Sequence, residues 1–331
     1  MKAKTEVFCC GREYDLYIAL LYSFANSTKI VLILSKELAK DQGLADTLIS
    51  YEFIVDVILI PDSGLHEKIF FSKKGKVNTL TNIILLKKRM KDVYVNRFNL
   101  LEKLNPYFES CVFNLFFVNT ALKLFCYTKA SKVRFIEEGA GIYKARDKKL
   151  YRFFWYLCFL PNKLGKERKV FEILLSKPEN WIADKKVKKW SPSDYEKNLT
   201  VLQKEFILSI FSSCNFKMFN SNKPKAIIIT QPLSEDGHCT EKQKVLLYKK
   251  YVNMLKGRYT IFIKTHPREV TSYTAFGQES GVEVIKEQYP IDLLNLVTEL
   301  SFEVGVTVSS TGLDNLSNVN KKIYIAKKGI I

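Results

Sequence analysis

The chain has 331 residues, more than one hydrophobic core usually organises, so we expect two domains of ordinary size. Hydrophobic residues make up 47% and charged residues 26% of the sequence, which excludes an intrinsically disordered chain. The excess of 52 Lys and Arg over 34 Asp and Glu gives a net charge of +18, which favours nucleic acid, acidic lipid or an anionic substrate as partner. The lysines are scattered in pairs, as on an ordinary solvated surface, so charge alone does not choose among these partners.

Neither a membrane span nor a zinc site is expected. No uncharged run approaches the roughly 18 residues of a membrane-spanning helix, and the N-terminus lacks the apolar stretch of a secretion signal. The seven cysteines form no Cys-x-x-Cys pair and lie mostly in apolar runs, as reduced, buried thiols do. We therefore expect a cytoplasmic protein, with peripheral contact to the inner face of the cell membrane as a further option.

The first part of the chain alternates between strand and helix patterns. Strands are expected at 6–10, 29–34, 53–60 and 132–136, and helices at 14–23, 38–50, 80–90 and 106–127. The segment 106–127 is predicted as one long apolar helix, with Asn114, Asn119 and Lys123 on its wetter side. Alternation of this kind predicts a doubly wound parallel sheet.

A second alternation follows Pro224, after an irregular stretch at 144–222. Strands are expected at 226–230, 259–264, 282–285, 302–307 and 322–326, and helices at 241–255, 291–296 and 313–317. The sequence thus predicts an α/β protein with two Rossmann-like domains facing a cleft, residues 1–185 and 186–331, with 186–222 partly a linker. Open α/β sheets bind ligands outside the carboxyl ends of their strands, so the residues just after the strands are the candidates for a site.

His266, one of only three histidines, follows the predicted strand at 259–264. Lys264 and Arg268 add positive charge on either side, and Pro267 stiffens the turn. A histidine placed between two cations can donate a hydrogen bond or a proton to a phosphate as it leaves. The alternative, a turn histidine that caps backbone carbonyls, has about the same weight.

Ser309, Ser310 and Thr311 follow the predicted strand at 302–307 and open a helix. Hydroxyls and free N–H groups at the start of a helix favour phosphate binding. An ordinary Ser/Thr cap is the commoner explanation for such a segment. Gly312 favours the phosphate site somewhat, because a glycine lets the backbone approach a ligand closely.

Acidic residues follow two further strands. Glu137, Glu138 and Gly139 close the strand at 132–136, and adjacent carboxylates on an extended chain point to opposite sides, so only one can face the cleft. A solvated turn is the alternative there. Gln231 and Asp236 lie after the strand at 226–230, where Asp236 is a second candidate base. No Asp-x-Asp stands at a strand end, so a divalent metal is not indicated.

Together these segments resemble the bacterial sialyltransferases. Glu137–Gly139 matches their D/E-D/E-G motif, His266-Pro267 their HP motif and Ser309–Thr311 their serine-rich motif. The resemblance is most specific to glycosyltransferase family 52, the lipooligosaccharide and capsule sialyltransferases. It spans residues 5–326, although 144–222 contributes little. It implies a glycosyltransferase-B (GT-B) fold in which 1–185 is the acceptor side and 186–331 binds the CMP-sugar.

The resemblance also implies an activity: inverting, metal-independent transfer of sialic acid from CMP-sialic acid to a terminal sugar, such as galactose, of a capsule or lipooligosaccharide. No cofactor is needed besides this donor. His266 would act on the departing CMP, and the base would be Asp236, as in family 52, or Glu138, as in related families. The implied CMP-binding residues are Lys264, Pro267, Arg268, Ile285, Lys286, Ser309, Ser310 and Thr311, with the backbone at Ile285 and Lys286 meeting cytosine. The implied acceptor residues are Glu137, Gly139 and Gln231.

Three alternatives remain open at this point. A polysialyltransferase would suit the +18 charge, because its acceptor is a polyanion. A glycosyltransferase using another sugar nucleotide is the second, and a basic protein that binds nucleic acid or membrane is the third. The aromatic and basic segment 151–169 has the composition of an interfacial anchor, but a buried helix explains it at least as well.

Overall fold

The computed structural model describes residues 5–35, 42–60, 90–118, 120–139, 167–181, 184–211, 216–220, 223–278, 281–285 and 289–325, with 38, 88, 142, 143 and 165. Most of the predicted anchor segment 151–169 and of the predicted helix 80–90 lies outside these residues, as does Lys286. The chain forms two compact units, Met1–Leu199 and Thr200–Ile331. The division falls within the 186–222 stretch that was expected to be partly a linker.

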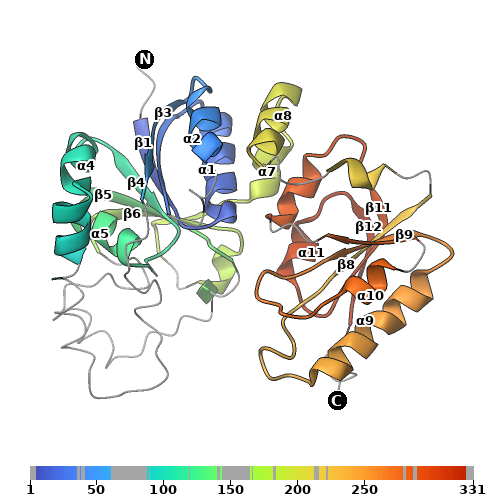
Figure 1. The fold of residues 1–331 in the computed structure, drawn as a ribbon. Coiled ribbons are helices and arrows are strands. Elements are labelled where there is room, and N and C mark those ends of the chain that lie inside the picture. Colours follow the sequence, from blue (N-terminus) through green and yellow to red (C-terminus); the bar gives the residue numbers. More distant parts are fainter. Residues whose placement is uncertain are drawn as a thin grey trace. The chain divides into compact units, whose positions relative to one another are not determined.

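The first unit contains a parallel sheet of seven strands in the order β3-β2-β1-β4-β5-β6-β7 (Figure 1). Its strands are β1 (Thr5–Cys10), β2 (Lys29–Leu34), β3 (Ile54–Leu59), β4 (Val112–Leu115), β5 (Lys132–Ile136), β6 (Val170–Leu175) and β7 (Val187–Lys189). The central strands are nearly continuous apolar runs, because helices cover both faces of such a sheet. In β2, for example, Ile30 to Leu34 are all fully buried.

Helices of the first unit connect these strands. They are α1 (Glu13–Asn26), α2 (Gln42–Ile49), the π-helix η1 (Lys91–Arg97), α4 (Leu100–Phe108), α5 (Ala121–Lys129), the 3-10 helix η3 (Pro178–Asn180) and α7 (Pro192–Glu196). Helix α1 is buried from Asp15 to Phe24, and the residue that caps its C-terminus, Ser27, adopts the left-handed conformation with φ 47°. No described helix has the length and apolar character needed to cross a membrane.

The predicted helix at 106–127 is wrong. Helix α4 ends at Phe108, Val112–Leu115 forms β4, and α5 then begins after Thr120, whose side chain accepts a hydrogen bond from the Lys123 N–H. An unbroken apolar run fits a buried parallel strand as well as a buried helix, so the pattern could not separate the two. Asn114 does not lie on a wet helix face: it is fully buried in β4 and donates to the Glu6 carboxylate at 2.9 Å.

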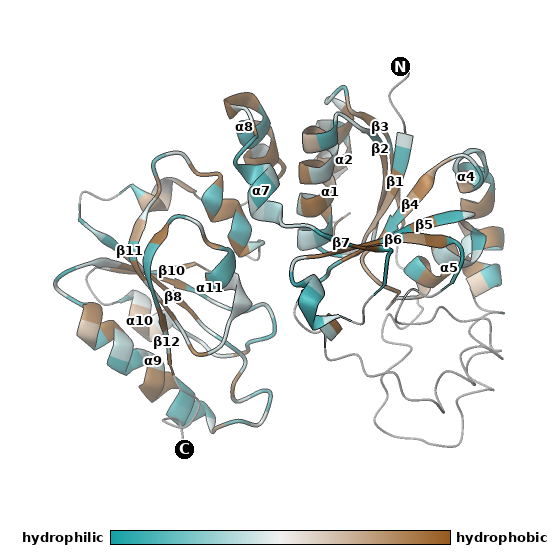
Figure 2. Cartoon of the chain, turned by 180° about the vertical axis from the view of Figure 1, so that it is seen from behind, coloured by the Kyte–Doolittle hydropathy of each residue, from teal (hydrophilic) through white to brown (hydrophobic). Residues whose placement is uncertain are grey.

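The second unit contains a parallel sheet of five strands in the order β10-β9-β8-β11-β12. The strands are β8 (Lys225–Ile229), β9 (Thr260–Lys264), β10 (Val282–Ile285), β11 (Phe302–Thr307) and β12 (Val319–Tyr324). The helices are α8 (Val201–Ile210), η4 (Phe216–Phe219), α9 (Glu241–Leu255), α10 (Thr274–Gly277), η5 (Ile291–Asn295) and α11 (Thr311–Asn315). Figure 2 shows hydrophobic and hydrophilic residues alternating along α9, as expected of a helix that packs one face on a sheet.

Gly305 brings β11 close to its neighbours. A Cβ built on this glycine would lie 2.5 Å from Leu313 Cδ1 of α11 and 2.9 Å from Val319 Cγ1 of β12. Distances this short are not tolerated between carbon atoms, so any side chain at position 305 would force the Leu313 and Val319 side chains to shift. The absence of a side chain at Gly305 therefore lets Leu313 of α11 and Val319 of β12 pack directly against β11.

Both units are α/β with a parallel sheet, which confirms the predicted fold class. Most predicted strands match the observed ones to within one or two residues. Lys132–Ile136 and Phe302–Thr307 agree at both ends.

Candidate functional site

The candidate site of the second unit lies where four neighbouring strands end level with one another. Ile285, Lys264, Ile229 and Thr307 stand side by side across β10, β9, β8 and β11. Two residues beyond this row lie His266, Gln231 and Ser309, which follow the ends of β9, β8 and β11 respectively. Since neighbouring strands are about 4.8 Å apart, the loops that carry His266 and Ser309 are separated by roughly 10 Å, with Gln231 between them.

The loops after β8 and β11 are joined by side chains. The Ser309 hydroxyl donates to Gln231 Oε1 at 2.7 Å, a contact between residues 78 apart in the sequence. The Gln231 N–H in turn donates to the Tyr248 hydroxyl at 2.9 Å, and the Thr307 hydroxyl donates to the Ile229 carbonyl at 2.9 Å. These bonds fix the edge of the sheet against α9.

Helix α11 opens at Ser310, which acts as its cap. The Ser310 side chain accepts the Gly312 N–H at 3.2 Å, and the Ser310 N–H donates to the Thr307 hydroxyl at 3.3 Å. Ser309 and Thr311 on either side are exposed. A Cβ at Gly312 would lie 3.0 Å from Ile291 Cγ2, so the turn is tightly packed beneath. Ser310 thus has a structural role, and the exposed hydroxyls of Ser309 and Thr311 are the ones that a ligand can reach.

His266 is half-buried, and its ring orientation is fixed by the turn that follows. Its Nδ1 accepts the Arg268 N–H at 3.1 Å, and its own N–H donates to Glu269 Oε2 at 2.8 Å. Because Nδ1 is an acceptor, the neutral ring carries its proton on Nε2. Burial, with the nearby Arg268 charge as the next cause, lowers the pKa of His266, while Glu269 and Asp236 oppose the shift. The ring therefore presents an Nε2–H donor.

Asp236 and Arg268 form a bidentate ion pair. The Arg268 guanidinium donates to both carboxylate oxygens, at 2.8 and 3.0 Å, and both side chains are exposed. Hydrogen bonding from Arg268 lowers the pKa of Asp236. The same bond from Asp236 raises the pKa of Arg268. While this pair holds, the carboxylate is a weak proton acceptor and the guanidinium is partly neutralised.

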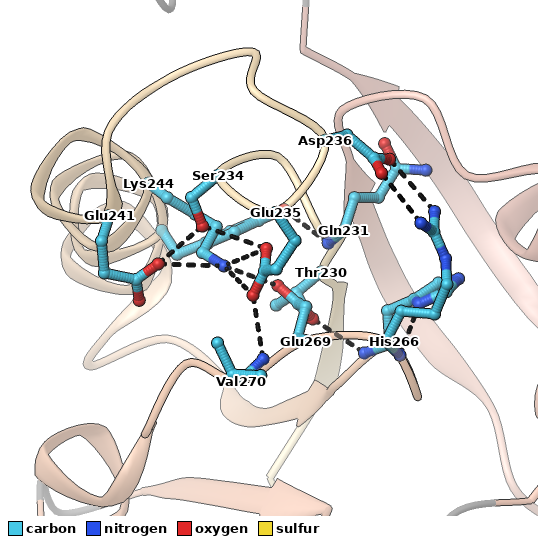
Figure 3. A network of polar contacts seen from close by, with 12 residues as sticks. Thr230, Gln231, Ser234, Glu235, Asp236, Glu241, Lys244, His266, Glu269 and Val270 are labelled. Atoms are coloured by element: carbon cyan, nitrogen blue, oxygen red, sulfur yellow. Dashed lines mark hydrogen bonds and ion pairs between the residues drawn. The ribbon is translucent and has the colours of Figure 1, made fainter. Parts of the chain in front are cut away.

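A charge network centred on a buried lysine lies beside this edge, and the sequence patterns did not reveal it (Figure 3). Lys244 of α9 is completely buried, and its ammonium donates to Glu235 at 2.8 and 3.0 Å. It also lies 3.3 Å from a carboxylate oxygen of Glu241 and 3.7 Å from one of Glu269. Burial acts to raise the pKa of Glu235, but the hydrogen bonds from Lys244 and the Val270 N–H outweigh it and hold that pKa at about 2.

One signal in the sequence pointed to part of this network. Glu241 and Lys244 are three residues apart on one helix, a spacing at which charged side chains meet. Nothing in the sequence indicated that Lys244 would be buried, because a lysine on an amphipathic helix is usually solvated.

Lys264 and Ile285, both predicted to meet CMP, lie at neighbouring strand ends. The Lys264 side chain is nearly buried, and its ammonium lies 4.6 Å from the centre of the Tyr289 ring. The Thr265 hydroxyl donates to the Ile285 carbonyl at 3.4 Å. The predicted cation at Lys264 is thus held under an aromatic ring, whereas Pro267 and Arg268 are exposed.

The acidic motif of the first unit divides into two different carboxylates. Glu137 is nearly buried and accepts the Tyr143 hydroxyl at 2.7 Å and the Ser176 N–H at 2.6 Å, so its carboxylate is used within the fold. Glu138 forms an ion pair with Arg12, which follows β1. Gly139 has φ +133°, a conformation that favours glycine. Of the two acids, Glu138 is therefore the one that a substrate can compete for.

A second buried pair, also missed in the sequence, lies at the end of β1. Asp15 and Lys123 are both buried, with Lys123 Nζ 3.1 Å from Asp15 Oδ2. The same oxygen accepts the Gly11 N–H at 2.9 Å, and Lys123 also donates to the Phe116 carbonyl at 3.1 Å. The pair fixes the turn that carries Arg12.

Among the described residues, no group of three or more His, Cys, Asp or Glu side chains is placed so that it could hold a metal ion.

Solved structures share this architecture. A sialyltransferase from Photobacterium damselae, represented by its GT-B domain, aligns with a TM-score of 0.54 and 12% identity over 96% of this chain and 89% of that one. A UDP-GlcNAc 2-epimerase from Neisseria meningitidis, bound to UDP-GlcNAc, aligns with a TM-score of 0.50 and 12% identity over 93% and 78%. At such identities the likeness establishes the fold alone. The fold is of the GT-B class.

The sequence itself gives the family. Residues 62–328 match the sequence model of glycosyltransferase family 52. The chain therefore belongs to this family, which is a sialyltransferase family, and the protein is a glycosyltransferase. This confirms the predicted resemblance. A protein of Haemophilus influenzae described as uncharacterized is 39% identical over 85 residues, which cover 26% of this chain and 26% of that protein.

Proposed function

We propose that this glycosyltransferase moves sialic acid from CMP-sialic acid to a terminal sugar, such as galactose, of a capsule or lipooligosaccharide. Membership in family 52 supports the donor. The observation that carries the proposal is the placement of His266, with its Nε2–H, and of the Ser309 and Thr311 hydroxyls on loops two strands apart in one sheet. A donor phosphate bound between these loops can meet groups from both.

In the proposed mechanism, the acceptor hydroxyl attacks the anomeric carbon while the bond from that carbon to the phosphate oxygen breaks. The acceptor proton goes to a carboxylate, and the configuration at the anomeric carbon inverts. His266 donates a hydrogen bond or a proton from Nε2 to the phosphate of the departing CMP. The Ser309 and Thr311 hydroxyls, with Arg268, bind the negative charge that develops there.

Two carboxylates remain candidates for the base, and each is paired with an arginine. Asp236 is held by Arg268, so its use as a base requires that this pair open or that the guanidinium turn to the phosphate. Glu138 is held by Arg12. Pairing with Arg268 lowers the pKa of Asp236, so this acid is ionised at neutral pH, as a base must be, but has a reduced affinity for a proton.

The direct test measures CMP release from CMP-sialic acid with lactose-type acceptors, with and without EDTA. Release that depends on the acceptor and survives EDTA supports the proposal. Parallel assays replace the donor by UDP-sugars, which tests for another sugar nucleotide, or the acceptor by oligosialic acid, which tests for polysialyltransferase activity. The proposal fails if the protein releases no CMP, or if it turns over only a UDP-sugar.

Contact with the inner membrane through the segment 151–169 stays a separate prediction, tested by sedimentation with anionic vesicles.

A further inference from the structure

Glu269 lies three residues after His266, and its carboxylate links the His266 backbone to Thr230, Tyr273 and Lys244. Its side chain is only 1% exposed. One carboxylate oxygen, Oε2, accepts the His266 N–H at 2.8 Å and also accepts the Thr230 hydroxyl of the neighbouring strand end. The other, Oε1, accepts the Tyr273 hydroxyl at 2.9 Å and lies 3.7 Å from Lys244 Nζ.

The buried charge of Glu269 is balanced from α9. Lys244 supplies the positive charge, and Glu235, its principal partner, also accepts the Val270 N–H at 2.9 Å. Val270 directly follows Glu269, so the turn that begins at His266 is bound to the rest of the unit at both of its ends (Figure 3). A buried carboxylate needs such compensation, because an unpaired charge in the interior is strongly destabilising.

We propose that Glu269 is a positioning residue for His266, and that the Lys244 network exists to hold its carboxylate at the His266 N–H. The inference rests on the proposed function, in which His266 Nε2 faces the leaving phosphate. Glu269 does not touch the phosphate. It fixes the backbone of the turn, which in turn fixes the Arg268 N–H against Nδ1 and directs Nε2 outward.

The negative charge of Glu269 also affects the pKa of His266. The charged groups around His266 are Arg268 and Lys264, which lower its pKa together with burial, and Glu269 and Asp236, which raise it. Removing the negative charge of Glu269 removes one of the two opposing groups. The His266 pKa should then fall further, and the ring should lose its proton at a lower pH.

Two substitutions separate position from charge. Glu269→Gln removes the charge while keeping the length of the side chain. Glu269→Asp keeps a negative charge at this position, but its side chain is one methylene too short to reach the His266 N–H. The matched control is Glu303→Gln, which removes an exposed carboxylate near the start of β11 that is hydrogen-bonded to Asn320 and does not belong to the Lys244 network.

The expected activity pattern follows from these differences. Both Glu269 variants should lower kcat for CMP release by about 10- to 100-fold, the scale of a misplaced catalytic group, with KM changed much less. Only Glu269→Gln should move the alkaline limb of the pH profile to lower pH. Glu303→Gln should stay within about twofold of wild type. The proposal is overturned if folded Glu269→Gln and Glu269→Asp both behave like Glu303→Gln. If Glu269→Gln does not fold, Glu269→Asp decides.

A spectroscopic readout separates this inference from the proposed function. With three histidines in the sequence, ring nitrogen NMR signals can be assigned by replacing His266. Wild type should show the Nε2–H tautomer, and the Glu269 variants a mixture of tautomers. An unchanged tautomer in both variants overturns the inference whatever the activity. If the wild-type protein releases no CMP, the proposed function fails, but the tautomer measurement still tests the role of Glu269.

Discussion

The Arg268 guanidinium binds both carboxylate oxygens of Asp236, at 2.8 and 3.0 Å, and its backbone N–H binds Nδ1 of His266. One residue thus contacts both a candidate base and the candidate acid of the proposed reaction. If the guanidinium turns toward the donor phosphate, it releases Asp236 while the backbone contact to His266 persists. Substrate binding and availability of this carboxylate would then be coupled.

Replacing the two candidate bases by amides should identify the one that acts. We expect either Asp236→Asn or Glu138→Gln to lower kcat by about 100-fold or more, because that is the usual scale for losing a general base. The other should retain most turnover, and both should still bind CMP by calorimetry. Substantial activity in both amide variants would contradict a carboxylate base altogether.

The pH profile of Arg268→Met provides an independent check on the same assignment. Hydrogen bonding from Arg268 depresses the Asp236 pKa, so removing the guanidinium should let that pKa rise. If Asp236 is the base, the acid limb of the kcat profile moves to higher pH. If Glu138 is the base, the acid limb stays in place and only the overall rate falls.

His266→Asn should lower kcat by about 100-fold or more while leaving the fold intact, because the Nε2–H donor to the leaving phosphate is lost. The measurement is steady-state CMP release, accompanied by circular dichroism. His238 is a suitable control, since it is exposed in the loop after β8 and makes none of the His266 contacts. His238→Asn should remain close to wild type. A His266→Asn enzyme with near wild-type turnover would refute the assignment.

Ser309→Ala and Gln231→Leu should weaken CMP binding together rather than independently. Their side chains share a hydrogen bond of 2.7 Å, and such a bond contributes about 1 kcal/mol, or roughly fivefold in affinity. A double-mutant cycle measured by calorimetry should give a coupling energy of about that size. Strict additivity of the two losses would show that the bond does not persist when CMP is bound.

Asp292 should make the unfolding free energy depend on pH. The carboxyl is buried beside Asn315, and burial raises its pKa to about 6, above the 3.9 of an unfolded chain. The folded state therefore keeps this proton to higher pH, and the group costs stability progressively as pH rises from about 4 to 6, up to about 3 kcal/mol. Asp292→Asn should thus gain stability over wild type between pH 5 and pH 7.5 in urea unfolding. An identical pH dependence for both proteins would contradict the raised pKa.

Local sequence patterns predict much of the fold, and they predict those residues of the candidate site that directly follow strands. The run Lys29–Leu34 is short and rich in β-branched residues, and it was correctly predicted as a buried strand. The level ends of β8, β9 and β11 bring Gln231, His266 and Ser309 to one edge of the sheet, because each follows its strand by the same two residues. The segment 106–127 was mispredicted because its apolar run contains both a strand and a helix. Its break at residues 109–111 is set by tertiary pairing of β4 between β1 and β5.

The rest of the site depends on contacts that no local pattern encodes. Glu269 becomes a buried carboxylate only because Lys244, 25 residues earlier in the chain, is folded beneath it. Likewise, the Glu138 carboxylate meets Arg12 only because the sheet order places β5 two strands away from β1, with β4 between them. Such pairs are decided by topology, and a single sequence contains no signal for them.

If the turn at Ser309–Thr311 binds the donor as proposed, Gly305 gives a way to alter nucleotide affinity from inside the fold. A methyl group there would meet the Leu313 side chain, and any movement of α11 that accommodates it would also move the Ser310 cap and the exposed hydroxyls on both sides. The displacement would act on the whole turn at once, unlike substitutions that delete one hydroxyl at a time. Variant libraries aimed at donor preference would therefore do well to include compensating small residues at position 313 alongside changes at 305.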